Sequence, residues 1–353
     1  PNQSFSTIDA TMMDRIEVLR GTSSASLGSD ALGGAINFLS TQASVRGTGE
    51  VHTSVVARGA GAESSAGLEG RANWSTDRFG AVATASARHM GNPVAGGAIG
   101  AQPFNSYNEW SASGNVAVEI SDRQLVRAAV QTTQQYDVLR AYGSSPLDFR
   151  KFTRQNRLLS YARYEVQPND LFRSARVTLS YQRQGERFER FRVAKNVRER
   201  EDLTVHTMGV QAETQFDFSR LGNIVAGVDM YLDRIESAAS TGALADEQLI
   251  LIRSMARYVP KSQYDSANAF ISYDVDLVPT LRLFAEGRGG YVRIGVPSDA
   301  RLFDRLGGGE AAILPAVQSI VGVYGWGAHL RYQPISAASF SAGATGGFRA
   351  PNI

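Results

Sequence analysis

The chain has 353 residues with 36 Lys and Arg against 34 Asp and Glu, a balance that does not favour a nucleic-acid partner. It contains no cysteine, which excludes disulfides, cysteine-ligated zinc and thiol nucleophiles. No uninterrupted apolar run reaches the length of a membrane-spanning helix, so no such helix is expected.

Both ends of the sequence read as cuts in a longer protein. No signal peptide precedes the first predicted element, and the sequence stops abruptly at Ala350-Pro351-Asn352-Ile353. We therefore expect the chain to be a piece of a larger molecule.

Residues 8–41 differ from the rest. Residues 14–21 alternate apolar with charged side chains and end at Gly21, which predicts a short strand; residues 22–27 suit a helical turn or tight loop. Residues 28–34 contain three glycines and precede an apolar strand at 35–39. This is not a phosphate-binding loop, because GxxxxGK[ST] and GxGxxG are absent and a strand follows where a helix would be needed.

From about residue 50 to residue 348, stretches of 8 to 14 residues alternate between two kinds of side chain and are then interrupted. Ala175, Val177 and Leu179 share one face of such a stretch, opposite Arg176 and Thr178. The pattern predicts 13 strands, each with one apolar and one polar face.

The predicted connections alternate in length. Tight turns are expected at 76–78, 121–123, 167–170, 219–222, 278–280 and 333–335. Between them lie a short connection at 59–66 and long loops at 91–106, 137–155, 185–201, 236–262 and 296–318. Short turns on one side and long loops on the other indicate a transmembrane β-barrel. A soluble sandwich or propeller is the alternative.

Two motifs resemble the TonB-dependent receptor family of bacterial outer membranes. The stretch Asp14-Arg15-Ile16-Glu17-Val18-Leu19-Arg20-Gly21, continued by residues 24–37, is similar to the end of its plug domain, with Thr22 and Leu27 as departures. The segment Gly347-Phe348-Arg349-Ala350-Pro351 resembles one that ends a mid-barrel strand in these receptors.

The resemblance implies an all-β fold: a transmembrane antiparallel β-barrel, partial, with about 13 of about 22 strands, and the C-terminal part of an α+β plug. We expect residues 1–45 to be plug and residues 46–353 to be the N-terminal part of the barrel. Two unpaired sheet edges inside a bilayer are costly, so we expect this piece not to fold alone.

The function implied by the resemblance is active import of a ferric siderophore, haem or a similar scarce nutrient across the outer membrane. The implied partners are a TonB-type energy-coupling complex acting on an N-terminal box, the metal chelate or haem, and lipopolysaccharide with outer-membrane lipid. We expect a monomer that is not an enzyme and needs no cofactor. The alternative is a passive outer-membrane channel or adhesin, which would lack a plug.

By the same resemblance, Arg20 lies where the plug forms a charged lock with carboxylates of the barrel wall. Inward-facing Glu69, Glu119, Glu213 and Glu286 are the possible partners. The other reading is that Arg20 only solvates the plug surface. Surface ion pairs are individually weak, which suits a plug that a modest pull must release.

Candidate ligand-binding residues are basic and aromatic side chains in the predicted loops, because guanidinium groups and aromatic rings suit an anionic chelate. They are Arg140, Tyr142, Arg150, Lys151, Arg154, Arg190, Arg192 and His89. Charged loops that meet lipopolysaccharide phosphates are the alternative reading. Four dispersed histidines and no nucleophile–base spacing give no catalytic or metal site.

Overall fold

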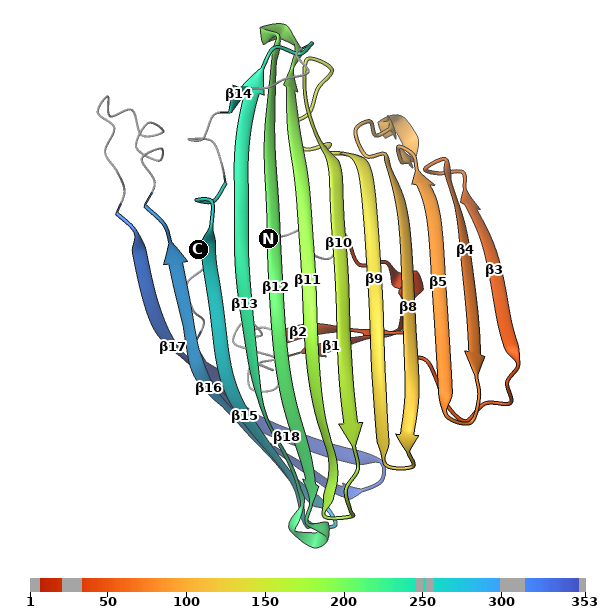
Figure 1. Ribbon diagram of the computed structural model, residues 1–353, viewed down its shortest axis with the longest axis vertical. Coiled ribbons are helices and arrows are strands. Elements are labelled where there is room, and N and C mark those ends of the chain that lie inside the picture. Colours follow the sequence, from red (N-terminus) through yellow and green to blue (C-terminus); the bar gives the residue numbers. More distant parts are fainter. Residues whose placement is uncertain (1–6, 21–33, 246–249, 252–256, 299–314, 349–353) are drawn as a thin grey trace.

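A computed structural model of the chain describes residues 7–20, 34–245, 250–251, 257–298 and 315–348. Thirteen consecutive neighbours from β3 to β18 form one antiparallel sheet, which confirms the predicted strand count, and β14 pairs with β13 off this path. This sheet, called the wall below, runs across Figure 1. None of the described helices is long and apolar enough to cross a membrane.

The wall strands follow one another along the chain. They are β3 (Val51–Ala60), β4 (Ser65–Ser75), β5 (Phe79–Met90), β8 (Tyr107–Ser121), β9 (Gln124–Leu139), β10 (Asp148–Val166), β11 (Phe172–Arg192), β12 (Val197–Asp217), β13 (Asn223–Gly242), β15 (Ser262–Val278), β16 (Leu281–Val296), β17 (Val317–Ile335) and β18 (Ala338–Gly347). The remaining described elements are η1 (Ala10–Met12), β1 (Met13–Arg20), β2 (Gly34–Ser40), β6 (Val94–Ala95), η2 (Gly97–Ile99), β7 (Gly100–Ala101), η3 (Val193–Lys195), η4 (Ser219–Leu221) and β14 (Ile250–Leu251).

The tight turns gather at the lower end of the wall in Figure 1, and the longer connections lie at its upper end. Five of the six predicted turns fall between consecutive strands as expected. The sixth prediction was wrong: residues 333–335 belong to β17, whose register shifts between Tyr332 and Ile335, and the turn follows at 336–337. A bulge in the strand produced the break that was read as a turn.

Three predicted upper loops are shorter than expected because the strands continue into them. One is the loop predicted at 236–262, since β13 continues to Gly242. β11 and β12 each have 21 residues, so only residues 193–196 remain from the loop predicted at 185–201. In the same way β10 begins at Asp148, inside the loop predicted at 137–155. The charges that suggested a loop pair across the strands instead, as Arg187 does with Asp202 at 2.7 Å, and such cross-strand pairs stabilise a continuing ladder.

The two faces of the wall differ in chemistry as the alternation predicted. On the outer face, large apolar side chains are exposed, among them Leu179 at 54 %, Met208 at 56 % and Val228 at 53 %. A contiguous apolar face of this kind is suited to hydrocarbon rather than to water. The inner face is polar, and many of its side chains are buried, including Thr84, Ser111, Asn115, Gln131 and Thr133.

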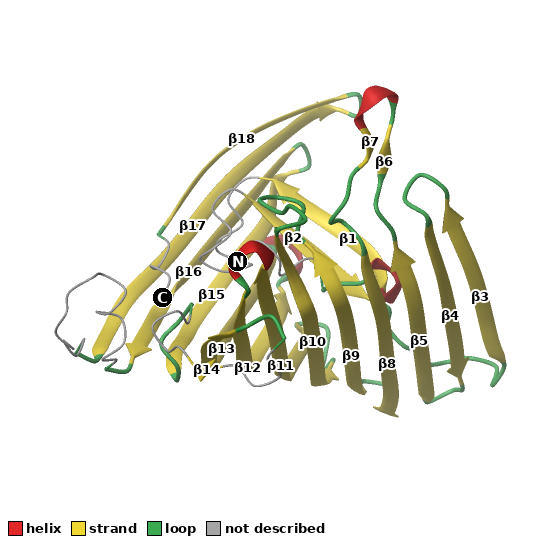
Figure 2. Ribbon diagram, turned by 90° about the horizontal axis from the view of Figure 1, so that it is seen from above, coloured by secondary structure: helices red, strands yellow, loops and turns green. Residues whose placement is uncertain are grey.

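The predicted strands before the wall are confirmed as β1 and β2, which pair antiparallel with Arg20 opposite Gly34. Figure 2 shows that the wall curves around this hairpin, so that β1 and β2 lie on its concave side. The glycine-rich stretch 28–33 and the predicted turn 22–27 lie outside the described residues. The hairpin and its flanking residues 7–12 and 41–46 are called the plug segment below.

Candidate functional site

The plug segment contacts the inner face of the wall at two places. The upper contact is made by Asp9, which is 1 % exposed. Its carboxylate accepts a hydrogen bond from Ser86 Oγ of β5 at 2.6 Å. Arg88, two residues further along β5 and on the same face, places Nη1 3.8 Å from Asp9 Oδ1. Asp9 and Ser86 are 77 positions apart in sequence, so only the folded chain brings them together.

Arg88 is shared between the plug and the wall. Its guanidinium also pairs with Glu109 of β8, which is 4 % exposed and accepts a hydrogen bond from Gln135 Nε2 of β9 at 2.5 Å. Asp9, Arg88, Glu109 and Gln135 therefore form one polar network, in which both carboxylates are buried and Arg88 is 33 % exposed; together with Ser86 it is called the upper anchor. It links the plug segment to three neighbouring wall strands.

The pKa of the Asp9 carboxyl lies below its ordinary value. Burial alone would raise this pKa, but the hydrogen bonds from Ser86 and from the Thr11 backbone N–H, together with the positive charge of Arg88, outweigh it. The Thr11 N–H donates to Asp9 Oδ1 at 3.0 Å, so the carboxylate also caps η1. The anchor thus favours an ionised Asp9.

The lower contact follows β2. The Ala43 N–H donates to Asn115 Oδ1 at 2.8 Å, and Arg127 Nη1 donates to the Ala43 carbonyl oxygen at 2.6 Å. Ala43 is buried against Val82 and Ala117 of the inner face. Arg46 pairs with Glu119, with 3.1 Å between Nη2 and Oε1. These contacts to β8 and β9, called the lower anchor, hold the chain where it passes from the plug segment to the wall.

The Arg20 side chain lies outside the described residues, so the expected lock remains a prediction. Three of its four possible partners have other cations nearby: Glu69 pairs with Arg58 at 3.5 Å, Glu119 with Arg46, and Glu213 with Arg176 at 2.8 Å. Sequence reasoning missed Asp9 altogether. A lone aspartate before a strand carries no signal that an arginine of the wall will face it.

The candidate ligand residues divide between the two faces of the wall. Arg140 lies over the rings of Phe152 and Phe188, 5.7 and 5.9 Å from their centroids, on the inner face. Arg190 shares this face and makes a bidentate pair with Asp148 through bonds of 2.8 and 2.5 Å. Two more candidates lie on the inner face. Arg150 of β10 lies opposite Arg190 of β11, and Arg192 pairs with Glu199 at 3.1 Å.

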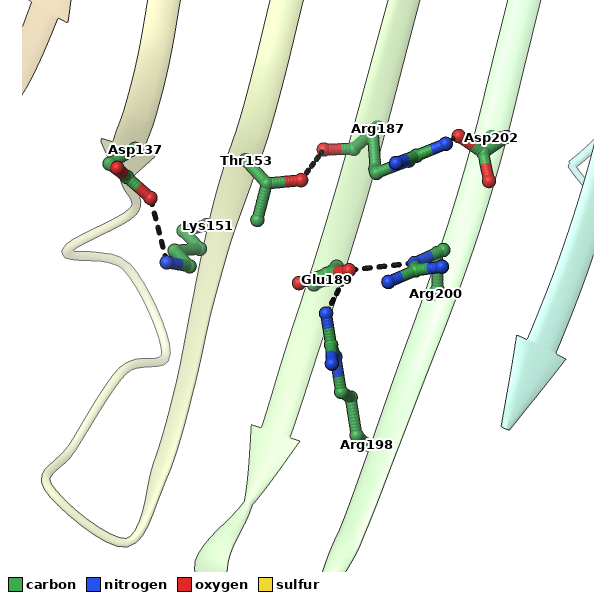
Figure 3. A network of polar contacts seen from close by, with 8 residues as sticks. All are labelled: Asp137, Lys151, Thr153, Arg187, Glu189, Arg198, Arg200 and Asp202. Atoms are coloured by element: carbon green, nitrogen blue, oxygen red, sulfur yellow. Dashed lines mark hydrogen bonds and ion pairs between the residues drawn. The ribbon is translucent and has the colours of Figure 1, made fainter. Parts of the chain in front are cut away.

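Lys151 and Arg154 project from the outer face instead. Lys151 Nζ donates to Asp137 at 2.7 Å and lies 5.6 Å from the centre of the Phe191 ring. Figure 3 shows Lys151 and Asp137 beside a second outer-face group, in which Arg198 and Arg200 both donate to Glu189 Oε1 at 2.7 Å. Glu189 is only 1 % exposed, because these arginines cover it.

A bulge in β10 decides this division. The register of β10 with β11 shifts between Phe152 and Arg154, so Phe152 takes the inner face and Lys151 the outer one. A one-residue shift moves every later side chain to the opposite face. The bulge therefore separates Lys151 from Arg190, although both belong to the basic residues at the upper end of the wall.

Two candidates have other surroundings. Tyr142 lies in the connection between β9 and β10 and is 86 % exposed. His89 is on the outer face of β5, where its Nδ1 lies 2.8 Å from Asn108 Oδ1. Within the described part of the chain, no group of three or more His, Cys, Asp or Glu side chains could hold a metal ion. The described residues at the upper end of the wall therefore offer cations and aromatic rings rather than a metal-binding cluster.

Comparison with known proteins agrees with this arrangement. Residues 1–35 match the family model described as the TonB-dependent Receptor Plug Domain. No curated protein matches the sequence. The match of the plug model ends at residue 35, near the start of β2, and the lower contact with the wall begins eight residues later, at Ala43.

Solved structures match nearly the whole chain. The copper transporter OprC superposes with a TM-score of 0.76 at 12 % identity and covers 96 % of this chain and 50 % of its own. The ferric citrate transporter FecA in its unliganded form gives 0.69 at 11 %, with 96 % and 50 % covered. The Serratia marcescens hemophore receptor HasR, in complex with HasA and heme, gives 0.67 at 14 %, with 93 % and 50 % covered. The chain spans about half the length of these structures, and at such identities the likeness shows the fold.

Proposed function

We propose that this chain, which has the plug sequence and the fold of TonB-dependent receptors, is part of an outer-membrane active transporter rather than an enzyme. The observation that carries the proposal is the plug segment on the polar inner face of a wall whose outer face is apolar. A barrel wide enough for a large ligand must be closed between transport events. A passive channel or adhesin has no need of such a plug.

Energy coupling follows from the way the plug is held. The contacts at both anchors are hydrogen bonds and ion pairs rather than a broad apolar interface. Each such bond contributes only about 0.5–3 kcal/mol, so a directed pull on the plug can break them in turn. The proposed partner is therefore a TonB-type complex that acts through a box N-terminal to the plug, and Arg20 is proposed to add a further contact to the wall.

The ligand that the inner face suits is an anionic chelate such as a ferric siderophore, or haem with its carboxylates. Arg140, Arg150, Arg190 and Arg192 supply the positive charge, and Phe152 and Phe188 supply rings beside it. Guanidinium groups bind carboxylate and catecholate oxygens with directed hydrogen bonds. Tyr142 is proposed to meet the ligand first, from its exposed connection.

Lys151 and Arg154 are proposed to face lipopolysaccharide instead. They lie on the outer face above the exposed apolar side chains of β10 and β11, as do Arg198 and Arg200. Cations just beyond an apolar band attract anionic lipid head groups, at roughly 1 kcal/mol per charge. His89 shares the outer face and is not part of the proposed ligand site. The boundary between the plug and barrel domains is proposed at residue 45, so Arg46, the last residue of the plug segment, is the first residue of the barrel domain.

Uptake by the full-length receptor tests the proposal. The receptor would be produced in a strain without its own iron receptors and supplied with labelled ferric citrate, a ferric catecholate, haem or a copper salt. We expect uptake of one of these to require TonB and the proton-motive force. Uptake that survives loss of both would indicate a passive channel, and no uptake beyond the control strain for any anionic chelate would contradict the proposed ligand class.

A further inference from the structure

The five residues before β15 lie against the inner face of the wall, near the candidate ligand residues. The Tyr258 N–H donates to Ser237 Oγ of β13 at 3.4 Å. The Lys261 N–H donates to the Ile235 carbonyl oxygen of the same strand at 2.9 Å. These two bonds hold the stretch along β13, and they bring Arg257, the residue before Tyr258, to the neighbouring strands β12 and β11.

Arg257 bridges two carboxylates that belong to different strands. Its Nη1 donates to Glu186 Oε2 of β11 at 3.4 Å, and its Nε lies 3.1 Å from Glu201 Oε1 of β12. The carboxylate side chains are only 13 and 20 % exposed. Glu201 lies directly opposite Phe188, and Glu186 precedes Phe188 by two residues on the same face. Arg257 therefore pairs with the two acids that border the Phe188 ring.

The charges around this ring nearly cancel without Arg257. The upper inner patch is defined here as the inner face of β10, β11 and β12 from the Arg157–Gln184 pair upward, together with Arg140. Its described cations are Arg140, Arg150, Arg157, Arg190 and Arg192, and its described carboxylates are Asp148, Glu186, Glu199 and Glu201. Five cations against four carboxylates give a sum of +1, which Arg257 raises to +2.

We propose that Arg257 sets the charge preference of the upper inner patch, so that the patch takes anionic rather than cationic ligands. Without this side chain, Glu186 and Glu201 would border the Phe188 ring as two unpaired carboxylates. Two such charges repel an anion and attract a cation over the distances of a binding site. The inference rests on the proposed function for the ligand class, and it makes Arg257 a specificity-determining residue of that ligand site.

The charge of the patch can be measured without a ligand, because the chain has no cysteine of its own. Gln184 lies on the inner face two residues before Glu186, about 7 Å away at roughly 3.4 Å per residue. The full-length receptor carrying Q184C would be labelled in 0.1 M salt with a negatively and a positively charged methanethiosulfonate. The ratio of the two rates reports the local potential.

Replacing Arg257 by glutamine should change this ratio in favour of the cationic reagent. One charge removed within about 10 Å should lower the ratio of the anionic to the cationic rate by roughly 3- to 10-fold. R257K keeps the charge and should leave the ratio close to that of the parent Q184C receptor. A ratio that R257Q leaves unchanged would overturn the inference.

Removing the acids as well separates charge from a purely structural role. If Arg257 only held its connection on the wall, R257Q/E186Q/E201Q should behave like R257Q. Because five cations and two carboxylates then give a sum of +3, we expect this triple variant to restore the ratio at least to the parent value. A triple variant with the low ratio of R257Q would contradict the proposal.

Gln211 provides the matched control position. It lies on the inner face of β12, ten residues from Glu201 and therefore about 34 Å away, beyond the screening length of roughly 10 Å in 0.1 M salt. The ratio measured at Q211C should not respond to R257Q, and an equal response there would overturn the inference. Titration with ferric citrate and with haem distinguishes the two proposals: the expected ratios without binding of either chelate would contradict the ligand class and leave the role of Arg257 standing.

Discussion

Asp9 of the plug segment and Arg88 of the wall lie 3.8 Å apart between Oδ1 and Nη1, with the Asp9 side chain fully buried. The arginine is also paired with Glu109, so one guanidinium serves the plug and the wall at once. Because Arg88 also pairs with Glu109, its positive charge keeps a partner when the plug moves. Arg88, whose side chain is partly buried, is therefore not left without a counter-charge.

Replacing Asp9 by asparagine should weaken the upper anchor without leaving a cavity. The amide keeps the size of the side chain but loses its charge and one acceptor oxygen, at a cost of about 1–3 kcal/mol for a buried hydrogen-bonded group. Backbone amides at Thr11 and Met12 should then exchange with deuterium about 5- to 150-fold faster in the full-length receptor. Unchanged exchange would mean that Asp9 does not hold the segment.

The upper anchor should weaken in acid. Because the folded-state pKa of Asp9 is depressed below its unfolded value, ionised Asp9 contributes stability above about pH 4, and this stability is lost as the pH falls through the folded pKa. Hydrogen exchange at Thr11, followed from pH 5 to pH 3 with correction for intrinsic rates, should show the loss. Asp9→Asn lacks the titrating group and should remove this part of the dependence.

Neutralising Arg140 should weaken ligand binding, whereas neutralising Arg154 should not. Both are basic residues at the upper end of the wall, but Arg140 lies over inner-face rings and Arg154 is on the outer face. A charge-assisted hydrogen bond contributes about 1.5–3 kcal/mol, so R140Q should raise the Kd of the transported chelate by about 10- to 150-fold. Titration of the purified receptor measures this, and an equal effect of R154Q would contradict the division between faces.

An arginine at Leu179 should hinder insertion of the barrel, and one at Ser180 should be tolerated. Leu179 is 54 % exposed on the outer face, where a positive charge near the bilayer midplane costs about 2–4 kcal/mol. Ser180, the next residue, faces the polar interior. Heat-modifiable mobility of the full-length receptor on gels compares L179R with S180R, and identical behaviour would indicate that the outer face does not meet lipid.

Much of the wall could be predicted from the sequence because a strand exposes its two faces alternately. The 13 strands, five turns, β1 and β2 all follow from alternation and its interruptions. The lengths of β11 and β12 did not follow, since a charged stretch that pairs with its neighbour looks the same in sequence as a charged loop. Pairing is a property of two strands and cannot be read from one.

Local order along the chain was enough to predict that one face of each strand is apolar and that a plug motif precedes the wall. The contact between Asp9 and Arg88 could be found only in the folded chain, since the two residues are 79 positions apart and meet because the hairpin lies against the curved sheet. The tertiary structure also decided which cations face the interior. A single extra residue in β10 turns Lys151 outward, and no periodic pattern marks where a bulge will form.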